Sequence, residues 1–155
     1  MKNKCMTAGF SLSAIFMLLV MITLVRADDV PPQGGKPLSA ILKSVEALQL
    51  GTVTTAEFDD GVWEIKVCKG KEGCVELYID PVSGEEKRRK TDDLEEEVPP
   101  ANARPLSSVI QSLEKRGLRV ITEVEFDDNV WEVKVREGRR QVKLYIDPVT
   151  GEEKR

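Results

Sequence analysis

Beyond residue 36 the chain alternates between two hydrophobic patterns, and this pair of patterns occurs twice. Each pair begins with apolar residues spaced three or four positions apart, which is the spacing of one buried face of a helix. A proline precedes each stretch and a glycine lies near its end, as is typical where helices begin and end. The apolar stripes are Leu38, Ile41, Leu42, Val45 and Leu48 in the first copy and Leu106, Val109, Ile110 and Leu113 in the second, with Lys43, Glu46, Gln111 and Glu114 on the polar side. The sequence therefore predicts one short amphipathic helix per copy.

Alternation of apolar and polar residues follows each predicted helix and indicates half-buried strands. In the second copy, one face of the first strand is expected to carry Val120, Thr122, Val124 and Phe126, and the other face Ile121, Glu123 and Glu125. A turn then follows at Asp59-Asp60-Gly61, or at Asp127-Asp128-Asn129 in the second copy. Because Gly and Asn tolerate positive φ best, their exchange at one position predicts a tight hairpin turn.

The two strands after this turn can be paired so that all their apolar residues lie on the same face. With Cys68 opposite Cys74, the predicted register is Val67 by Val75, Ile65 by Leu77, Trp63 by Ile79 and Lys66 by Glu76. The second copy allows the same register, with Val135 by Val142, Val133 by Leu144 and Trp131 by Ile146. We therefore predict an α+β fold of two repeats, each with one helix packed on a three-stranded antiparallel sheet.

Residue identity relates the two copies as closely as the spacing does. Glu57-Phe58-Asp59-Asp60 recurs as Glu125-Phe126-Asp127-Asp128, and the segment 77–82 recurs as 144–149. One fold is therefore expected twice. The predicted boundaries are 37–88 and 104–155 for the repeats, 28–36 for an N-terminal linker, and 89–103 for a linker rich in charge and proline.

The first 27 residues differ in composition from the rest. Lys2 and Lys4 precede an apolar run that ends at Val25, and Val25-Arg26-Ala27 is similar to a cleavage site. This layout is typical of a secretory signal peptide, so residues 1–27 are predicted to be removed and the chain to be periplasmic or secreted. The alternative is an uncleaved anchor, because about 20 apolar residues can span a bilayer. We expect membrane binding only in that case.

Two cysteines remain after the predicted cleavage, Cys68 and Cys74. An oxidising compartment lets a disulfide persist, and the predicted register places the two residues opposite each other. A redox or metal-binding pair is the alternative, but the spacing is not C-x-x-C and no further ligand lies nearby. The second copy has Arg136 and Gln141 at these positions, so the fold does not require the bridge.

Charge and composition narrow the possible functions. The 155-residue chain has a net charge of −4 and contains no histidine. A nucleic-acid partner is not expected, because binding phosphates needs a basic face. The missing histidine removes the commonest general base and the commonest zinc ligand. We expect no cofactor, no metal and no catalytic residues.

Two motifs recur in both copies: Val-Trp-Glu-(Ile/Val)-Lys-Val, which begins at Val62 and Val130, and Leu-Tyr-Ile-Asp-Pro-Val-(Ser/Thr)-Gly-Glu-Glu, which begins at Leu77 and Leu144. The Asp-Pro-x-(Ser/Thr)-Gly-Glu part of the second motif is the most characteristic of a known family. At these residues the chain resembles the PepSY domain, a small module of secreted bacterial proteins. The resemblance covers 37–87 and 105–154. It implies a helix packed on an antiparallel sheet and a role in restraining peptidase activity, as in the propeptides of certain metallopeptidases. No peptidase domain follows the repeats in this sequence.

Three functions compete on these observations. The first is a non-catalytic module that binds an envelope protein or peptide, for example a peptidase, through the polar sheet face, where tyrosines among charged residues suit recognition. The residues of this candidate face are Glu64, Lys66, Glu76, Tyr78, Glu132, Lys134, Lys143 and Tyr145. The second is a carboxylate-rich cation binder using Asp59, Asp60, Asp127 and Asp128, although turn chemistry explains these residues more simply. The third, a small hydrolase, would depend on carboxylates alone.

A local carboxylate group after the third predicted strand has two explanations as well. Asp80, Glu85 and Glu86 could form a cation or substrate site, but they lie in one short loop without a converging further ligand. Aspartate bonds backbone amides ahead of it, proline presets φ, and glycine accepts the left-handed conformation. The segment from Asp80 to Gly84 therefore predicts a structural turn.

Overall fold

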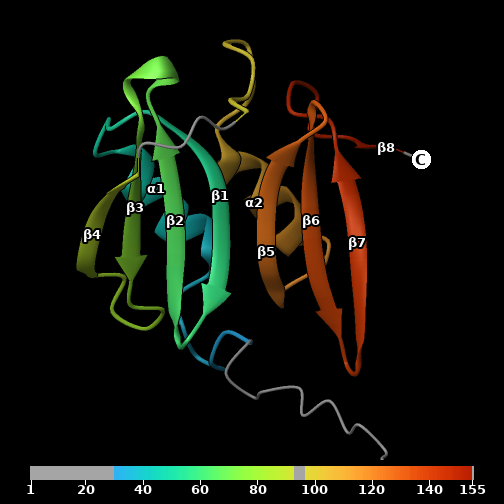
Figure 1. The fold of residues 1–155 in the computed structure, drawn as a ribbon. Coiled ribbons are helices and arrows are strands. Elements are labelled where there is room, and N and C mark those ends of the chain that lie inside the picture. Colours follow the sequence, from blue (N-terminus) through green and yellow to red (C-terminus); the bar gives the residue numbers. More distant parts are fainter. Residues whose placement is uncertain (1–29, 93–96, 155) are drawn as a thin grey trace, which may run out of the picture.

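The structure, a computed structural model, describes residues 30–92 and 97–154 and has the predicted α+β composition (Figure 1). The predicted signal peptide lies outside the described residues. The elements, in chain order, are α1 (Leu38–Glu46), β1 (Thr52–Asp59), β2 (Val62–Cys68), the short 3-10 helix η2 (Gly70–Glu72), β3 (Cys74–Ile79), β4 (Glu86–Asp92), α2 (Leu106–Lys115), β5 (Ile121–Asp127), β6 (Val130–Glu137), β7 (Arg140–Ile146) and β8 (Glu153–Lys154).

All eight strands belong to one antiparallel sheet, in the order β4-β3-β2-β1-β5-β6-β7-β8. This corrects the expectation of a three-stranded sheet in each repeat, a prediction that left open whether the two repeats pack together. Each repeat contributes four strands, and the two halves join where β1 pairs with β5. The fourth strand of the first repeat, β4, includes Arg89–Asp92, the first residues of the expected linker. Its sequence is almost entirely polar, so it lacks the alternation that identifies a half-buried strand.

The junction of the two repeats has approximate two-fold symmetry. Ala56 of β1 lies opposite Val124 of β5, and these two residues hold equivalent positions in the two repeats. On either side of them, Thr55 faces Glu125 and Glu57 faces Glu123. The single chain therefore joins its halves through the same surface on each half, as a symmetric dimer does.

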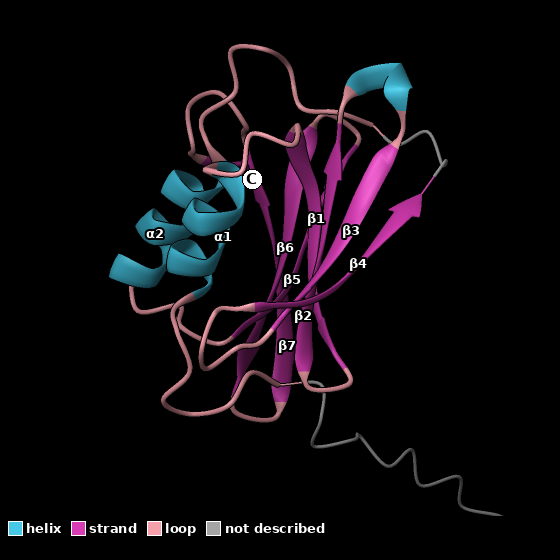
Figure 2. Ribbon diagram, turned by 90° about the vertical axis from the view of Figure 1, so that its left-hand side faces the viewer, coloured by secondary structure: helices cyan, strands magenta, loops and turns pink. Residues whose placement is uncertain are grey.

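Both helices pack on one face of this sheet, and the opposite face carries no helix in the described part of the chain (Figure 2). Each helix begins directly after a proline, as predicted. The first helix ends at Glu46, so Leu48 is not part of its apolar face and is 48% exposed. The prediction for Leu48 is wrong because the chain turns away through Gln49, whose φ is 54°. Leu50 packs against the core instead.

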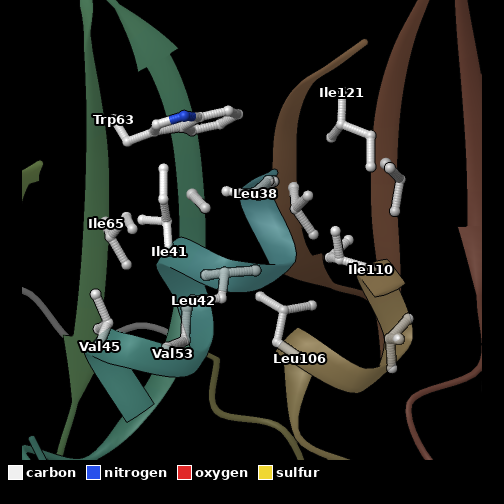
Figure 3. Packing of buried hydrophobic residues seen from close by; sticks show 14 of the residues in the cluster. Leu38, Ile41, Leu42, Val45, Val53, Trp63, Ile65, Leu106, Ile110 and Ile121 are labelled. Carbon is white, nitrogen blue, oxygen red and sulfur yellow. The ribbon is translucent and has the colours of Figure 1, made fainter. Parts of the chain in front are cut away.

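The hydrophobic core fills the space between the helices and the sheet and is continuous across both repeats (Figure 3). Trp63 and Trp131 are each 1% exposed, which confirms that the alternating strands enclose an apolar layer. Each indole makes an edge contact with the phenylalanine directly opposite on the neighbouring strand, Phe58 or Phe126, with ring centroids 5.4 and 5.2 Å apart. Such aromatic pairs add stability beyond the area that they bury.

The predicted hairpin registers are confirmed in both repeats. Trp63 lies opposite Ile79, Cys68 opposite Cys74, and Trp131 opposite Ile146. The disulfide between Cys68 and Cys74 is present. The hairpin turns have positive φ at Asp60 and Gly61 and, in the second copy, at Asp128 and Asn129, as two-residue turns of this type require.

The first strand of each repeat departs from simple alternation. A β-bulge interrupts the register between Ile121 and Glu123, and an equivalent bulge lies between Val53 and Thr55. The extra residue lets Ile121 join the core, so the prediction that Ile121 lies on the polar face is wrong. Thr122 is also buried, as predicted, and its hydroxyl donates a hydrogen bond to the carbonyl of Lys134.

Backbone hydrogen bonds hold the chain just before each helix, at the end of the expected N-terminal linker (Lys36) and at the start of the second predicted repeat (Arg104). Lys36 donates its amide to the carbonyl of Pro81, and Arg104 donates its amide to the carbonyl of Pro148. Each helix therefore starts from the Asp-Pro turn of its own repeat. The side chain of Arg104 also lies over Gly151, where a Cβ atom would come within 2.9 Å of its guanidinium.

Candidate functional site

The sheet face away from the helices, here called the open face, carries all eight residues of the predicted candidate surface. The strand register places them in cross-strand pairs: Glu64 with Tyr78, Lys66 with Glu76, Glu132 with Tyr145, and Lys134 with Lys143. Residues that alternate with them on the same strands form the core. The alternation in the sequence was sufficient to find these side chains, because successive residues of a strand point to opposite faces.

The two tyrosines of the open face have different environments. Tyr78 is only 5% exposed, whereas Tyr145 is 42% exposed. The ring of Tyr78 lies beneath Arg88, whose guanidinium carbon is 3.9 Å from the ring centroid, and its hydroxyl donates a 2.6 Å hydrogen bond to Glu76. Lys90 also bonds the Tyr78 hydroxyl, which raises the pKa of that lysine. Tyr145, but not Tyr78, is therefore available to a partner.

Two lysines of the second repeat lie opposite each other, and each forms an ion pair with a glutamate on a neighbouring strand. Lys134 binds Glu123 at 2.6 Å, and Lys143 binds Glu132 at 2.6 Å. The hydrogen bond to Glu132 raises the pKa of Lys143. These partly exposed pairs fix the direction of the side chains more than they stabilise the fold, because exposed ion pairs contribute little.

Carboxylates gather at the centre of the open face. Glu57 lies directly opposite Glu64 on one side and opposite Glu123 on the other, while Glu125 lies opposite Glu132. Partial burial, and then the charge of Glu123, raise the pKa of both Glu57 and Glu125. Burial, followed by the charge of Glu76, raises the pKa of Glu64. Like charges directly across a sheet repel each other, so this centre attracts cations and basic side chains.

A shallow hollow of about 310 Å³ lies on the open face where the two repeats meet. Its walls include Glu57, Asp59, Glu123, Arg136 and Gln141. The Nε atom of Arg136 is buried and has no hydrogen-bond partner among the described residues. The hollow therefore offers one cationic group among carboxylates, which suits polar recognition.

The predicted candidate surface did not include Glu57, Glu123 or Glu125. The alternation nevertheless places Glu123 and Glu125 on the polar side of their strand. Their proximity to Glu57 and Glu64 depends on the pairing of β1 with β5. That pairing joins strands from different repeats. The repeated Glu-Phe-Asp-Asp motif was the signal in the sequence, because it places equivalent carboxylates on both central strands.

The Asp-Pro segments form the predicted structural turns. One carboxylate oxygen of Asp80 accepts hydrogen bonds from the amides of Val82 and Ser83, at 2.9 and 2.8 Å. Asp147 makes the same two bonds in the second repeat. The hydrogen bond from Lys87 and those from the backbone amides hold the pKa of Asp80 well below its ordinary value. These carboxylates therefore serve the turn.

The carboxylates considered for cation binding do not cluster in the described part of the chain. Those residues contain no group of three or more metal-ligating side chains, either at the hairpin aspartates or in the Asp80 loop. Asp60 and Asp128 occupy the left-handed positions of their turns. Within 30–92 and 97–154, no helix has the length and apolarity needed to cross a membrane.

The comparisons with known proteins agree with the sequence motifs. A family model described as peptidase propeptide and YPEB domain matches residues 11–90 and 93–153. The chain belongs to this family, the PepSY proteins. PepSY domains are propeptide and regulatory modules without catalysis of their own, and they indicate an extracytoplasmic protein. The two matched segments correspond to the two repeats of this PepSY protein.

Two further comparisons add little. No curated protein matches the chain significantly. The crystal structure of a candidate lipoprotein from Clostridium difficile 630 is similar over 77% of this chain and 90% of that chain, with 12% identity and a TM-score of 0.46. A likeness at this level does not carry a function to the PepSY protein.

Proposed function

We propose that this PepSY protein binds an extracytoplasmic protein or peptide through the open face and that the partner is a peptidase whose activity it restrains. The observation that supports the proposal is the contrast between the two sides of the sheet. Two helices cover one side, while the other presents paired charged side chains, the exposed Tyr145 and a polar hollow across both repeats. Flat surfaces that combine tyrosine with charged residues are typical of protein recognition.

Charge on the open face favours a particular kind of contact. Glu57, Glu64 and Glu125 share a crowded acidic centre in which each pKa is raised. A lysine or arginine of the partner placed there would relieve the repulsion among these carboxylates. Tyr145 lies beyond this centre, on β7, and offers an aromatic ring to the same partner.

Restraint by this protein would be steric. Both cysteines in the described residues are joined in the disulfide, and the chain has no histidine. A bound partner would meet a sheet that offers neither a free thiol nor an imidazole in the described residues, so binding would block access to a peptidase cleft without chemistry.

The test uses the full mature chain as bait for extracytoplasmic extract, followed by a peptidase assay on the captured proteins. We expect the chain to retain a peptidase and to lower its rate of peptide hydrolysis. Glu57→Lys with Tyr145→Ala should abolish both effects, because the first change reverses the acidic centre and the second removes the exposed ring. Lys43→Ala with Gln111→Ala, on the exposed side of the two helices, is the matched control and should change neither effect.

Two results would contradict the proposal. One is capture that survives the open-face changes but is lost in the helix-face control, because the contact would then lie on the other side of the molecule. The other is a partner that is bound through the open face and keeps its full peptidase activity, which would leave binding without restraint.

A further inference from the structure

The hollow on the open face contains four side chains whose polar groups have no partner. Glu57, Asp59, Arg136 and Gln141 line it, and none of them makes a side-chain hydrogen bond or an ion pair in the part of the chain that the structure describes. The remaining carboxylate of the wall, Glu123, is already engaged in an ion pair. The hollow therefore offers a ligand both acceptors and donors of hydrogen bonds.

Three strands hold these side chains around a depression. Glu57 and Asp59 alternate on β1 and so lie on the same face of the sheet, while Arg136 on β6 lies directly opposite Gln141 on β7. Between them, β5 contributes Thr122, whose short side chain is buried. The volume of about 310 Å³ is at the small end of the range for ligand pockets, about 300–1,000 Å³. Such a hollow suits one end of a peptide.

The fold does not explain Arg136. Its Nε atom is buried without a hydrogen-bond partner among the described residues, which costs free energy instead of contributing it. The first repeat forms the same hairpin with Cys68 and Cys74 at the positions of Arg136 and Gln141, and a disulfide offers no N–H group. Because the hairpin needs neither the guanidinium nor the amide, a ligand explains these two side chains better than the fold does.

We propose that the hollow binds the free amino terminus of a peptide or protein partner. The α-ammonium group would lie between Glu57 and Asp59, and the carbonyl oxygen of the first residue would accept hydrogen bonds from Arg136. Capture of a terminal amine is a recurring mode of peptide recognition. The inference rests on the open face as the binding surface proposed above and names the group that the partner places there.

Charge favours a terminal ammonium group over a carboxylate. Glu57 and Asp59 give the hollow two unpaired negative groups, against the one positive group of Arg136. A carboxylate ligand would therefore meet more repulsion than attraction. An ammonium group would instead relieve the repulsion between Glu57 and Glu123, which lie directly opposite each other.

The position of Arg136 favours a terminal amine over a lysine side chain. A lysine would satisfy the two carboxylates, but it would bring no acceptor for the guanidinium. The first residue of a peptide carries both groups, because its carbonyl oxygen lies close to its own ammonium group. The amide of the next residue can donate a hydrogen bond to the side-chain oxygen of Gln141.

The test titrates the isotope-labelled full mature chain with three short peptides and follows the NMR signals of the chain. Ala-Ala-Ala-amide has only a free amino terminus, acetyl-Ala-Ala-Ala has only a free carboxylate, and acetyl-Ala-Lys-Ala-amide has only a cationic side chain. We expect the first peptide to bind at least about tenfold more tightly than the other two, because lost hydrogen bonds to charged groups cost that much affinity. The largest shifts should come from Glu57, Asp59, Arg136 and Gln141.

Two variants separate the site from the fold. Arg136→Met keeps a long side chain but removes the guanidinium, and it should weaken binding of Ala-Ala-Ala-amide by at least about tenfold. Arg136→Cys with Gln141→Cys gives the second repeat the disulfide of the first, and it should abolish binding while the amide spectrum stays that of a folded protein. Arg139→Met removes the same charge from the exposed turn of this hairpin and is the matched control, which should bind as the unchanged chain does.

Several results would overturn the inference. They are equal or tighter binding of either acetylated peptide, undiminished affinity in Arg136→Met, shifts confined to the helices, and no binding of any peptide. The capture experiment on extract tests the proposed function separately. A peptidase retained through the open face together with a failed titration would overturn this inference alone, whereas a successful titration without peptidase capture would support it and overturn the proposed restraint.

Discussion

Glu114, near the end of α2, accepts two hydrogen bonds from Ser39, near the start of α1 and 75 residues earlier in the chain. The amide of Ser39 lies 3.1 Å from one carboxylate oxygen and its hydroxyl lies 2.5 Å from the other. Glu46 binds Ser107 in the same way, at 2.9 and 2.5 Å. Neither helix has a local side-chain cap, because a proline precedes each one. Each repeat therefore caps the helix of the other.

This reciprocal capping predicts that Glu114→Ala destabilises the protein by about 1–2 kcal/mol, because a partly buried amide and hydroxyl lose a charged acceptor. By symmetry, Glu46→Ala should cost a similar amount. Urea denaturation measures both values. Gln111→Ala, at an exposed position of the same helix, is the control and should shift the free energy of unfolding by less than about 0.5 kcal/mol. Equal effects of Glu114→Ala and Gln111→Ala would show that the caps do not join the repeats.

The disulfide should stabilise the first repeat without determining the fold. Cys68 and Cys74 are six residues apart, so the bridge closes a short loop. Replacing both residues by alanine is expected to cost about 2 kcal/mol, since short loops remove little entropy from the unfolded chain. The far-ultraviolet circular dichroism spectrum should stay unchanged, because the second repeat forms the same hairpin with Arg136 and Gln141. A variant that loses its sheet signal would contradict this prediction.

The buried indoles should contribute more than any other core side chains. Trp63→Ala is expected to destabilise the protein by about 3–5 kcal/mol through loss of buried area and formation of a cavity. Trp63→Phe should cost clearly less, because it also removes an indole Nε1 that has no hydrogen-bond partner among the described residues. Thermal unfolding followed by circular dichroism measures both variants. An alanine variant no less stable than the phenylalanine variant would place Trp63 outside the core.

The acidic centre of the open face should make stability depend on pH. The pKa values of Glu57 and Glu125 are raised, so the folded protein binds protons more readily than the unfolded chain at these sites. Their ionised forms destabilise the fold above the raised pKa, and this effect disappears as the pH falls toward the ordinary value of 4.5. Glu57→Gln should therefore stabilise the protein at pH 7 by about 0.5 kcal/mol, as expected for opposed like charges, and by almost nothing near pH 4.

Urea denaturation at both pH values measures this difference. Glu85→Gln, at an exposed position outside the acidic centre, is the control and should show no comparable gain at pH 7. A gain for Glu57→Gln that grows as the pH falls would have the wrong sign and would contradict the account of the open face.

Much of each repeat could be predicted because its pairing is local. The hairpin registers, the buried tryptophans and the disulfide all follow from side chains that alternate across a short turn. The eight residues of the candidate face follow from the same alternation. The exposure of Leu48 and the burial of Ile121 could not be predicted, since the first depends on where a helix ends and the second on a β-bulge.

The contacts between the two repeats could not be predicted from the sequence patterns. The polar faces of the helices carry Glu46 and Glu114, which look like solvated residues until α1 and α2 lie side by side. The acidic centre and the hollow depend on β1 meeting β5. The alternation within one strand does not determine which strand of the other repeat pairs with it.

The central claim is that the two repeats form one sheet through β1 and β5. It is tested most directly by nuclear Overhauser contacts between Ala56 and Val124, which lie opposite each other at the junction and are both fully buried. Antiparallel pairing brings the Cα atoms of opposed residues within about 4.5–5.5 Å, so strong contacts between the two residues are predicted. A spectrum with all the expected contacts within each repeat and none between Ala56 and Val124 would contradict the claim.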